Sequence, residues 1–434
     1  MPSRDGEVGR SRKAAFVALY VLFLGAVFEG GSRLVLAVRG RGSPARTSGS
    51  AGAAIDVEAA GRALGLNPYE IADARRPGQW KLRAGSTLTL QEVLDAKERE
   101  GRILAVRYLR ERAPRLGVRP QDIVVRINSQ GYRGPEIDRD HTRFRILAIG
   151  DSCTFGTLLP PYGYPRALER ELRRFGVEAE VINAGVEGYG PGNVLQRMDD
   201  FLALRPDLAT IYLGWNALYG ESFLDDASGA RRYFYSARLA GLAYSRATRL
   251  VGHPGRQALQ DYERPRRPDP QAPEIRALDD YTPSFLGDIE QIVEALQSAG
   301  SRVVLLTLPG LYATDEPPSP RALEVGHLPT FTDNPYVLAR MAGVYNEALR
   351  ALGTKRSLQV VDLETWSRKA LRPREDHFFD SVHLYEASQD LVAAYLALEL
   401  APQLSKQGPR PSGASLRAAP LAPGSCGSDR PPGW

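Results

Sequence analysis

Three side chains in this sequence have the types and the spacing that hydrolysis of an ester requires. Ser152 lies just after the mostly apolar run 144–149, and far downstream Asp380 and His383 are three residues apart. A serine hydroxyl is a weak nucleophile at neutral pH, so a base must take its proton during attack. An imidazole suits that role, and a carboxylate fixes its tautomer and stabilises the imidazolium. The sequence therefore predicts a catalytic triad of Ser152, Asp380 and His383.

An ester hydrolase also needs hydrogen-bond donors for the oxyanion that develops on the substrate, and two segments look suited to supply them. The first is a short strand that ends at Gly185 and runs into a glycine-rich loop. The second is a strand that begins at Asp207 and runs on to Asn216. A glycine lets a backbone N–H approach a ligand closely, and an asparagine at a strand end can point a side-chain N–H the same way.

Four short motifs now stand in order along the chain, and together they resemble the SGNH/GDSL hydrolase superfamily over roughly residues 128–400. The motifs are Gly150-Asp151-Ser152, Gly185, Gly214-Trp215-Asn216 and Asp380-Ser381-Val382-His383. The resemblance implies that Ser152 is the nucleophile and that Asp380 and His383 complete the triad. It also implies that the Ser152 N–H, the Gly185 N–H and the Asn216 side chain form the oxyanion hole. One difference is Ala217, where the family often has a non-catalytic aspartate.

Each of these residues also has a purely structural interpretation. Ser152 could be a turn or N-cap residue, and Asn216 could cap a helix. Gly185 could serve a tight turn, and His383 could be a satisfied core histidine. Two rivals for the catalytic roles are His377, which has no aspartate three residues before it, and Cys153, as an alternative nucleophile.

Other classes of site find little support. The G-x-S-x-G elbow of an ordinary α/β-hydrolase is absent around Ser152. The glycine-rich loop after Ile182 lacks the dinucleotide fingerprint, and no metal-ligand cluster is apparent. The sequence therefore predicts neither a cofactor nor a metal.

From residue 144 onward, apolar runs alternate with helical patterns. Strands are expected at 144–149, 179–183, 208–213, 302–309 and 358–363, and helices at 164–174, 194–204, 285–299, 336–352 and 386–400. Continuous apolar strands between helices are typical of a parallel sheet covered on both faces. The predicted fold is therefore a three-layer α/β/α, SGNH or flavodoxin-like. Active sites in such sheets lie at the carboxyl ends of strands, where Ser152, Gly185 and Asn216 are expected.

The N-terminal part carries a targeting pattern. Arg10, Arg12 and Lys13 precede the apolar run 14–28, and apolar residues resume at 34–38. We expect a short cytoplasmic stub and an uncleaved signal-anchor transmembrane helix within residues 1–39, with the catalytic domain outside the cytoplasm, periplasmic or at the cell surface. A buried core helix is the alternative.

Composition divides the rest of the chain. Residues 40–54 are predicted to be a flexible linker, and residues 55–140 a small preface segment with a helix at 91–113. Within the preface segment, a glycine- and proline-rich turn at 128–136 carries Arg133, which could lie near the active site, although a structural ion pair is the favoured expectation. The hydrolase domain spans 141–401 with an insertion at 217–284, which is either a lid or a surface excursion, and 402–434 is predicted to be disordered.

Composition also limits the partners. The 434 residues are 43% hydrophobic, which is ample for a core, and the net charge of +5 is too small to indicate nucleic-acid binding. The two cysteines, Cys153 and Cys426, give no disulfide framework.

The prediction for function is a membrane-anchored serine esterase that acts through an acyl-enzyme. The resemblance suggests a short acyl group, such as acetyl, on an envelope or secreted glycan as its substrate. The same residues would also serve an O-acyltransferase that passes the acyl group to a polysaccharide. A lipid esterase remains open, as does a non-catalytic envelope or glycan-binding protein, although the intact Ser/Asp/His set argues against the latter.

Overall fold

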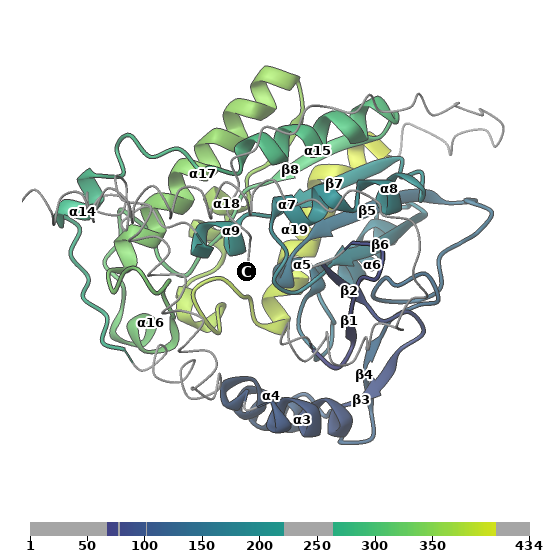
Figure 1. The fold of residues 1–434 in the computed structure, drawn as a ribbon, viewed down its shortest axis with the longest axis horizontal. Coiled ribbons are helices and arrows are strands. Elements are labelled where there is room, and N and C mark those ends of the chain that lie inside the picture. Colours follow the sequence, from purple (N-terminus) through teal and green to yellow (C-terminus); the bar gives the residue numbers. More distant parts are fainter. Residues whose placement is uncertain (1–66, 77–78, 101, 221–263, 405–434) are drawn as a thin grey trace, which may run out of the picture. The chain divides into compact units, whose positions relative to one another are not determined.

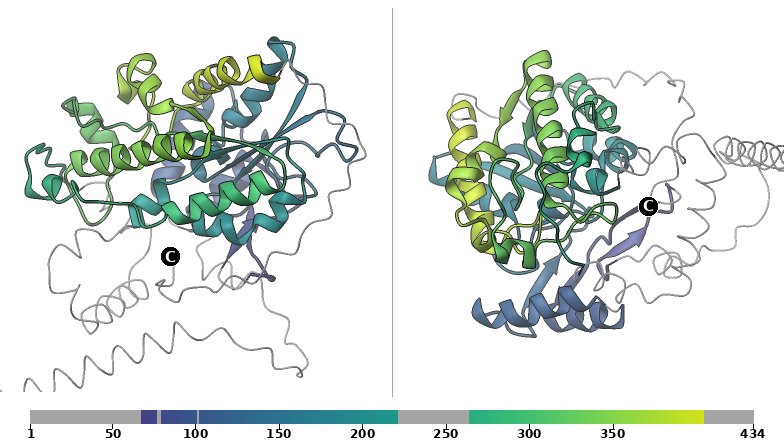
Figure 2. Two further views of the ribbon diagram at one scale, coloured as in Figure 1. Left: turned by 90° about the horizontal axis from the view of Figure 1, so that it is seen from above. Right: turned by 90° about the vertical axis from the view of Figure 1, so that its left-hand side faces the viewer.

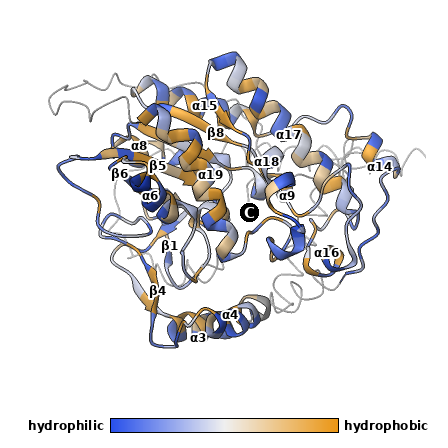
Figure 3. Cartoon of the chain, turned by 180° about the vertical axis from the view of Figure 1, so that it is seen from behind, coloured by the Kyte–Doolittle hydropathy of each residue, from blue (hydrophilic) through white to orange (hydrophobic). Residues whose placement is uncertain are grey.

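A five-stranded parallel sheet forms the centre of this computed structural model, which describes residues 67–76, 79–100, 102–220 and 264–404 (Figure 1). The strand order is β6-β5-β7-β8-β9. Figure 3 shows these strands as largely hydrophobic, as expected for strands buried on both faces. The strands are β5 (Phe144–Gly150), β6 (Ala179–Gly185), β7 (Leu208–Tyr212), β8 (Arg302–Leu306) and β9 (Gln359–Val361).

Helices cover both faces of this sheet (Figure 2). On one face, α6 (Tyr164–Arg174) packs against α19 (Glu386–Leu404), and on the other lie α15 (Leu286–Ser298) and α17 (Pro335–Arg356). In α6, Leu168 and Leu172 are buried, while Arg166, Arg170 and Arg173 stay exposed, so the helical period turns one face toward the sheet. The predicted three-layer α/β/α architecture is confirmed.

Several predicted helix boundaries differ from the structure, and α17 also runs four residues past the expected end at residue 352. The helix expected at 194–204 is two helices, α7 (Pro191–Gln196) and α8 (Met198–Leu202), because the backbone of Arg197 leaves the helical region. The helix expected at 91–113 is likewise two helices, α3 (Leu90–Arg99) and α4 (Ile103–Arg115). The last helix, α19, continues to the buried Leu404 and so takes three residues from the predicted tail.

The described part of the preface segment is built from two small antiparallel pairs and the helices α3 and α4. Strand β1 (Glu70–Ala72) pairs with β2 (Trp80–Leu82), and β3 (Thr87–Thr89) pairs with β4 (Ile123–Arg126). After β4 the chain turns, and the Arg133 N–H donates to the Asn183 carbonyl on the edge strand β6. The preface segment is thereby attached to the sheet through main-chain hydrogen bonding.

Several short helices lie in the connections. They are α5 (Ser152–Phe155), α9 (Trp215–Gly220), α14 (Pro273–Arg276), α16 (Pro320–Val325), α18 (Leu363–Ala370) and the 3-10 helix η1 (Arg374–Asp376). The predicted anchor helix, the linker, residues 221–263 of the insertion and the tail from residue 405 lie outside the described residues. Among the helices that are described, none is long and apolar enough to cross a membrane.

Candidate active site

The turn after β5 places Ser152 at the first position of α5. The side chain of Asp151 caps this helix by accepting a hydrogen bond from the Cys153 N–H at 2.9 Å. The first N–H groups of a helix have no partner within it, and the Ser152 N–H donates no hydrogen bond to any other described residue. The hydroxyl and the N–H of Ser152 are therefore both available for a substrate.

A small hairpin in front of α19 carries the other two predicted catalytic residues. Phe378 and Leu384 bridge its two sides, and Asp380 Oδ1 accepts hydrogen bonds from the N–H groups of Val382 at 2.8 Å and His383 at 2.7 Å. An aspartate that accepts from the backbone two and three residues on fixes a tight turn. The three-residue spacing thus presents Asp380 and His383 to each other.

The structure brings Ser152, Asp380 and His383 together in the predicted relation. The Ser152 Oγ lies 2.7 Å from His383 Nε2, and His383 Nδ1 lies 2.7 Å from Asp380 Oδ2. The ring of Phe379 stacks against the imidazole, with 5.4 Å between the ring centroids. The orientation of His383 is therefore held by one hydrogen bond on each ring nitrogen and by one ring face.

The electrostatics of the pair Asp380 and His383 favour its charged form. Burial alone would lower the pKa of His383, but the charge and hydrogen bond of Asp380 raise that pKa to about 9. Burial would conversely raise the pKa of Asp380, but His383 holds it well below its usual range. Such a carboxylate stabilises the imidazolium that forms when the histidine accepts a proton.

The two other segments predicted to supply oxyanion donors contact each other. The Asn216 Nδ2 donates to the Tyr189 carbonyl at 3.0 Å, so α9 is tied to the loop 186–190 that follows β6. Asn216 is the second residue of α9 and is not its N-cap. An amide nitrogen has two N–H groups, so the second of Asn216 stays available to a ligand.

The prediction for Gly185 needs a correction. Its N–H donates to Asn183 Oδ1 at 3.0 Å and is therefore engaged within the protein. A Cβ at Gly185 would lie 2.2 Å from the Phe155 nitrogen, so this glycine allows α5 to pack against the end of β6. Gly188 is exposed, has a φ of +78° that favours glycine, and its N–H donates no hydrogen bond to the described residues. A backbone N–H that is not engaged by the described residues thus lies three residues downstream, in the same glycine-rich loop.

With this geometry established, comparison with known proteins identifies the family. The profile of the GDSL-like Lipase/Acylhydrolase family matches residues 148–391, more than half of the chain. The chain belongs to this family. It is therefore an SGNH-type esterase, and the family's substrates are esters.

The chain is also similar, at low identity, to several solved structures. They include Axe2, an acetylxylan esterase from Geobacillus stearothermophilus (15% identity over 59% of this chain and 93% of that one, TM-score 0.37). They also include the acetyl xylan esterase AlAXEase (17% identity over 59% of this chain and 99% of that one, TM-score 0.36). A third is a putative acylhydrolase from Bacteroides fragilis (18% identity over 62% of this chain and 91% of that one, TM-score 0.34). No curated protein matches the chain.

The two alternatives to this GDSL-type triad, His377 and Cys153, are engaged elsewhere. His377 Nδ1 lies 2.9 Å from Ser388 Oγ, so its ring pairs with the first turn of α19. Cys153 is buried, its thiol faces the Val382 carbonyl, and burial raises its pKa well above the ordinary value, which argues against a nucleophilic role.

The prediction that Arg133 forms an ion pair was wrong. Its guanidinium is buried and donates to the carbonyls of Phe155 and Thr157 at the end of α5. It also lies over the Phe155 ring at 4.2 Å from the centroid. A cation at a helix C-terminus is stabilised by the free carbonyls, so Arg133 supports the helix that carries Ser152.

The preface segment also contacts the active-site loop directly. The two carboxylate oxygens of Glu187 accept hydrogen bonds from two preface side chains, Asn67 Nδ2 and Tyr69 OH, each at 2.7 Å. The Trp80 Nε1 donates to the Glu187 carbonyl at 3.1 Å. Burial would raise the pKa of Glu187, but the charge of the buried Lys97 lowers it, so the carboxylate stays ionised. We call this set the Glu187 clamp. It holds the residue next to Gly188.

The raised pKa of His383 predicts an alkaline pH dependence. A protonated imidazole cannot accept the serine proton, so kcat/KM for a neutral ester should rise with pH and reach half of its maximum near pH 9. Initial rates from about pH 6 to about pH 10, with spontaneous hydrolysis subtracted, would measure this. A plateau that is already complete at about pH 7 would show an imidazole with its ordinary pKa.

Removing the side chain of Asn216 should lower the rate. Asn216→Ala loses one oxyanion donor and the tether to Tyr189, so kcat should fall by about 10²- to 10³-fold with a much smaller change in KM. Steady-state kinetics on a p-nitrophenyl ester would measure the effect. Asn193→Ala is the matched control, because Asn193 binds Gln79 and the Gly190 N–H in the same region. Equal losses in both variants would contradict a specific role for Asn216.

Proposed function

We propose that this protein hydrolyses a carboxylic ester by way of an acyl-enzyme on Ser152. The observation that carries the proposal is the 2.7 Å contact between Ser152 Oγ and His383 Nε2, continued to Asp380 at 2.7 Å. His383 takes the serine proton as Oγ attacks the ester carbonyl. The N–H groups of Ser152 and Gly188 and the side chain of Asn216 then stabilise the oxyanion.

The second half of the reaction uses the same groups. His383 returns the proton to the departing alkoxide, and the alcohol leaves while Ser152 remains acylated. His383 next takes a proton from water, whose oxygen attacks the acyl carbonyl. Collapse of this second oxyanion expels the serine oxygen, which regains its proton from His383, and the carboxylic acid departs. Each cycle consumes one ester and one water.

The proposed substrate is a short acyl ester, such as an acetyl group, on an envelope or secreted glycan. This proposal is supported by the family and by the N-terminal pattern of Arg10, Arg12 and Lys13 before an apolar run. A signal-anchor helix there would hold the catalytic domain outside the cytoplasm, where such glycans occur.

The test uses the full-length protein with p-nitrophenyl esters of increasing chain length and with an acetylated polysaccharide. We expect turnover that is greatest for acetate, together with release of free acetate from the polysaccharide. Acetate that appears on an added acceptor glycan, and not in solution, would instead identify an acyltransferase. A folded protein that turns over no ester and resists covalent labelling by a fluorophosphonate would overturn the proposed chemistry.

A further inference from the structure

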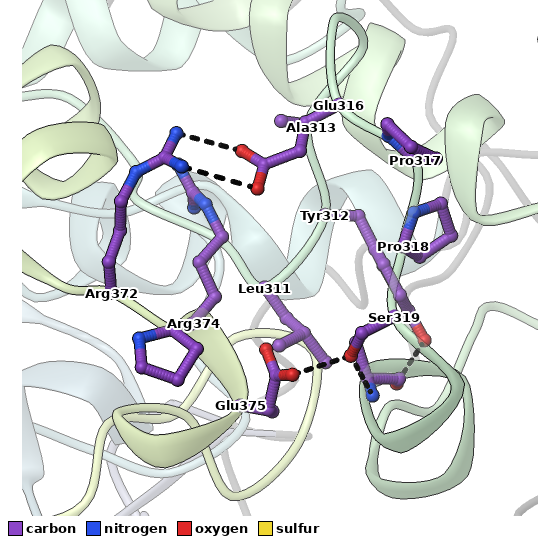
Figure 4. Close-up of a pocket in the computed structure, with 12 residues that line it drawn as sticks. Leu311, Tyr312, Ala313, Glu316, Pro317, Pro318, Ser319, Arg372, Arg374 and Glu375 are labelled. Atoms are coloured by element: carbon purple, nitrogen blue, oxygen red, sulfur yellow. Dashed lines mark hydrogen bonds and ion pairs between the residues drawn. The ribbon is translucent and has the colours of Figure 1, made fainter.

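A pocket of about 320 Å³ lies between the loop that follows β8 and the segment that precedes the catalytic hairpin (Figure 4). Tyr312, Glu316 and Ser319 contribute to one side, and Arg372, Arg374 and Glu375 to the other. Its volume falls in the range of small-ligand sites, and it has a mixed polar and apolar lining.

The guanidinium of Arg374 is incompletely satisfied. The residue is 7% exposed, it donates a hydrogen bond to the Gly310 carbonyl, and its Nε is buried without a partner. In the described part of the chain it forms no ion pair. By contrast, the equally buried Arg133 donates to several main-chain carbonyls. Burying an uncompensated charge is costly, so Arg374 has capacity for an anion that the protein itself does not supply.

The carboxylates beside the pocket are already engaged. Glu316 forms an ion pair with Arg372 at 3.0 Å, shown by the dashed lines in Figure 4. Glu375 accepts a hydrogen bond from Ser319 Oγ at 2.6 Å, and this bond lowers its pKa. Burial is the main cause that lowers the pKa of Arg374, and the nearby charge of Arg368 adds to it. A bound anion would offset both effects, because an opposite charge stabilises the charged guanidinium.

The loop that lines the pocket contacts both segments that carry catalytic residues. Gly310, whose carbonyl binds Arg374, packs so closely on the ring of Trp215 that a Cβ would lie 3.1 Å from it. The next residue, Leu311, donates its N–H to the Ser381 carbonyl at 2.9 Å. Trp215 precedes Asn216 and Ser381 follows Asp380, so this wall is shared with both catalytic segments.

We propose that this pocket binds a carboxylate on the substrate glycan, as on a uronic acid residue next to the sugar that carries the ester. A guanidinium matches a carboxylate in shape and charge and can bind both of its oxygens. The pocket lies beyond the carboxyl end of β8, where ligands of parallel sheets bind. The inference rests on the proposed function and narrows its substrate to acidic glycans.

The kinetic test compares two substrates that differ in one group. An acetylated oligosaccharide with a glucuronic acid side residue is assayed beside the same compound after its carboxyl has been reduced to the alcohol. We expect the wild type to prefer the acid. In Arg374→Met, the ratio of kcat/KM for the acid to that for the alcohol should fall by about 10- to 100-fold, mainly through KM. Arg340→Met, which removes an arginine that pairs with Asp279, is the matched control and should keep the wild-type ratio.

A binding test keeps the proposal independent of catalysis. Titration calorimetry of D-glucuronate, D-glucose and inorganic phosphate into the wild type and Arg374→Met should show binding of glucuronate by the wild type alone. If Arg374→Met does not fold, competitive inhibition of the wild type is measured instead. Inhibition by glucuronate but not by glucose would support the carboxylate site, and equal or absent inhibition would overturn it.

The outcomes separate the two proposals. Equal losses on the acid and the alcohol, or no preference in the wild type, would overturn the carboxylate site while leaving the esterase intact. Tighter binding of phosphate than of glucuronate would overturn it in favour of a phosphorylated ligand. Glucuronate binding without turnover of any ester would sustain the site and overturn the proposed hydrolysis.

Discussion

Replacing Ser152 with alanine will lower ester hydrolysis by about 10⁴- to 10⁶-fold and leave the fold intact. The reason is that Ser152 Oγ is the atom that bonds to the acyl carbon, and no other described hydroxyl or thiol lies within hydrogen-bond distance of His383 Nε2. Its only described side-chain hydrogen bond is to His383, and alanine is well tolerated in a helix. The measurement is kcat on p-nitrophenyl acetate, together with circular dichroism and thermal unfolding.

A neighbouring variant controls for disturbance of α5. Cys153→Ala changes the next residue, whose buried thiol faces the Val382 carbonyl, and it should retain activity of the same order as the wild type. Fluorophosphonate labelling would exclude a contaminating esterase. If Ser152→Ala then kept more than about one hundredth of the wild-type activity, the proposed mechanism would be wrong.

Asp380→Asn is expected to have the second largest effect, a loss of about 10⁴-fold in kcat when each enzyme is compared at the pH of its maximum rate. The asparagine oxygen can still accept the N–H groups of Val382 and His383, so the hairpin should keep its shape. Its NH₂ group then faces His383 Nδ1 and donates to it, which puts the imidazole proton on Nε2. In that tautomer Nε2 cannot accept the serine proton.

The pH dependence provides a second readout for the same substitution. Because Asp380 raises the pKa of His383 to about 9, the variant should titrate at a markedly lower pH, and the histidine signal in NMR spectra would report this directly. Asp376→Asn alters a half-exposed aspartate on η1 and serves as the control. An unchanged histidine titration in Asp380→Asn would contradict the coupling of the two residues.

The sheet could be predicted because its strands carry their own signal. Buried parallel strands such as β5 and β8 are apolar at nearly every position, and this pattern does not depend on their neighbours. The helix break at Arg197 could not be predicted in the same way, because arginine is a residue type that helices readily accept.

The site shows the same division between local and distant causes. Asp380 and His383 could be paired from the sequence because a four-residue turn presents them to each other. The choice between Gly185 and Gly188 could not be made, because it depends on whether Asn183 occupies the N–H of the former. The partners of Arg133 were equally hidden, since they are main-chain carbonyls of residues 155 and 157 and leave no pattern in residue type.

The Glu187 clamp couples the attachment of the preface segment to the conformation of the loop 186–190, which carries Gly188. Asn67 and Tyr69 bind a residue adjacent to Gly188, so an inhibitor that grips the Gly188 N–H stabilises the arrangement in which the clamp is closed. This coupling is reciprocal. If the closed clamp increases the binding free energy of the inhibitor by some amount, the bound inhibitor stabilises the attachment of the preface segment by the same amount. The preface segment lies outside the matched family region, yet its attachment therefore contributes to the binding free energy of ligands that use the Gly188 N–H.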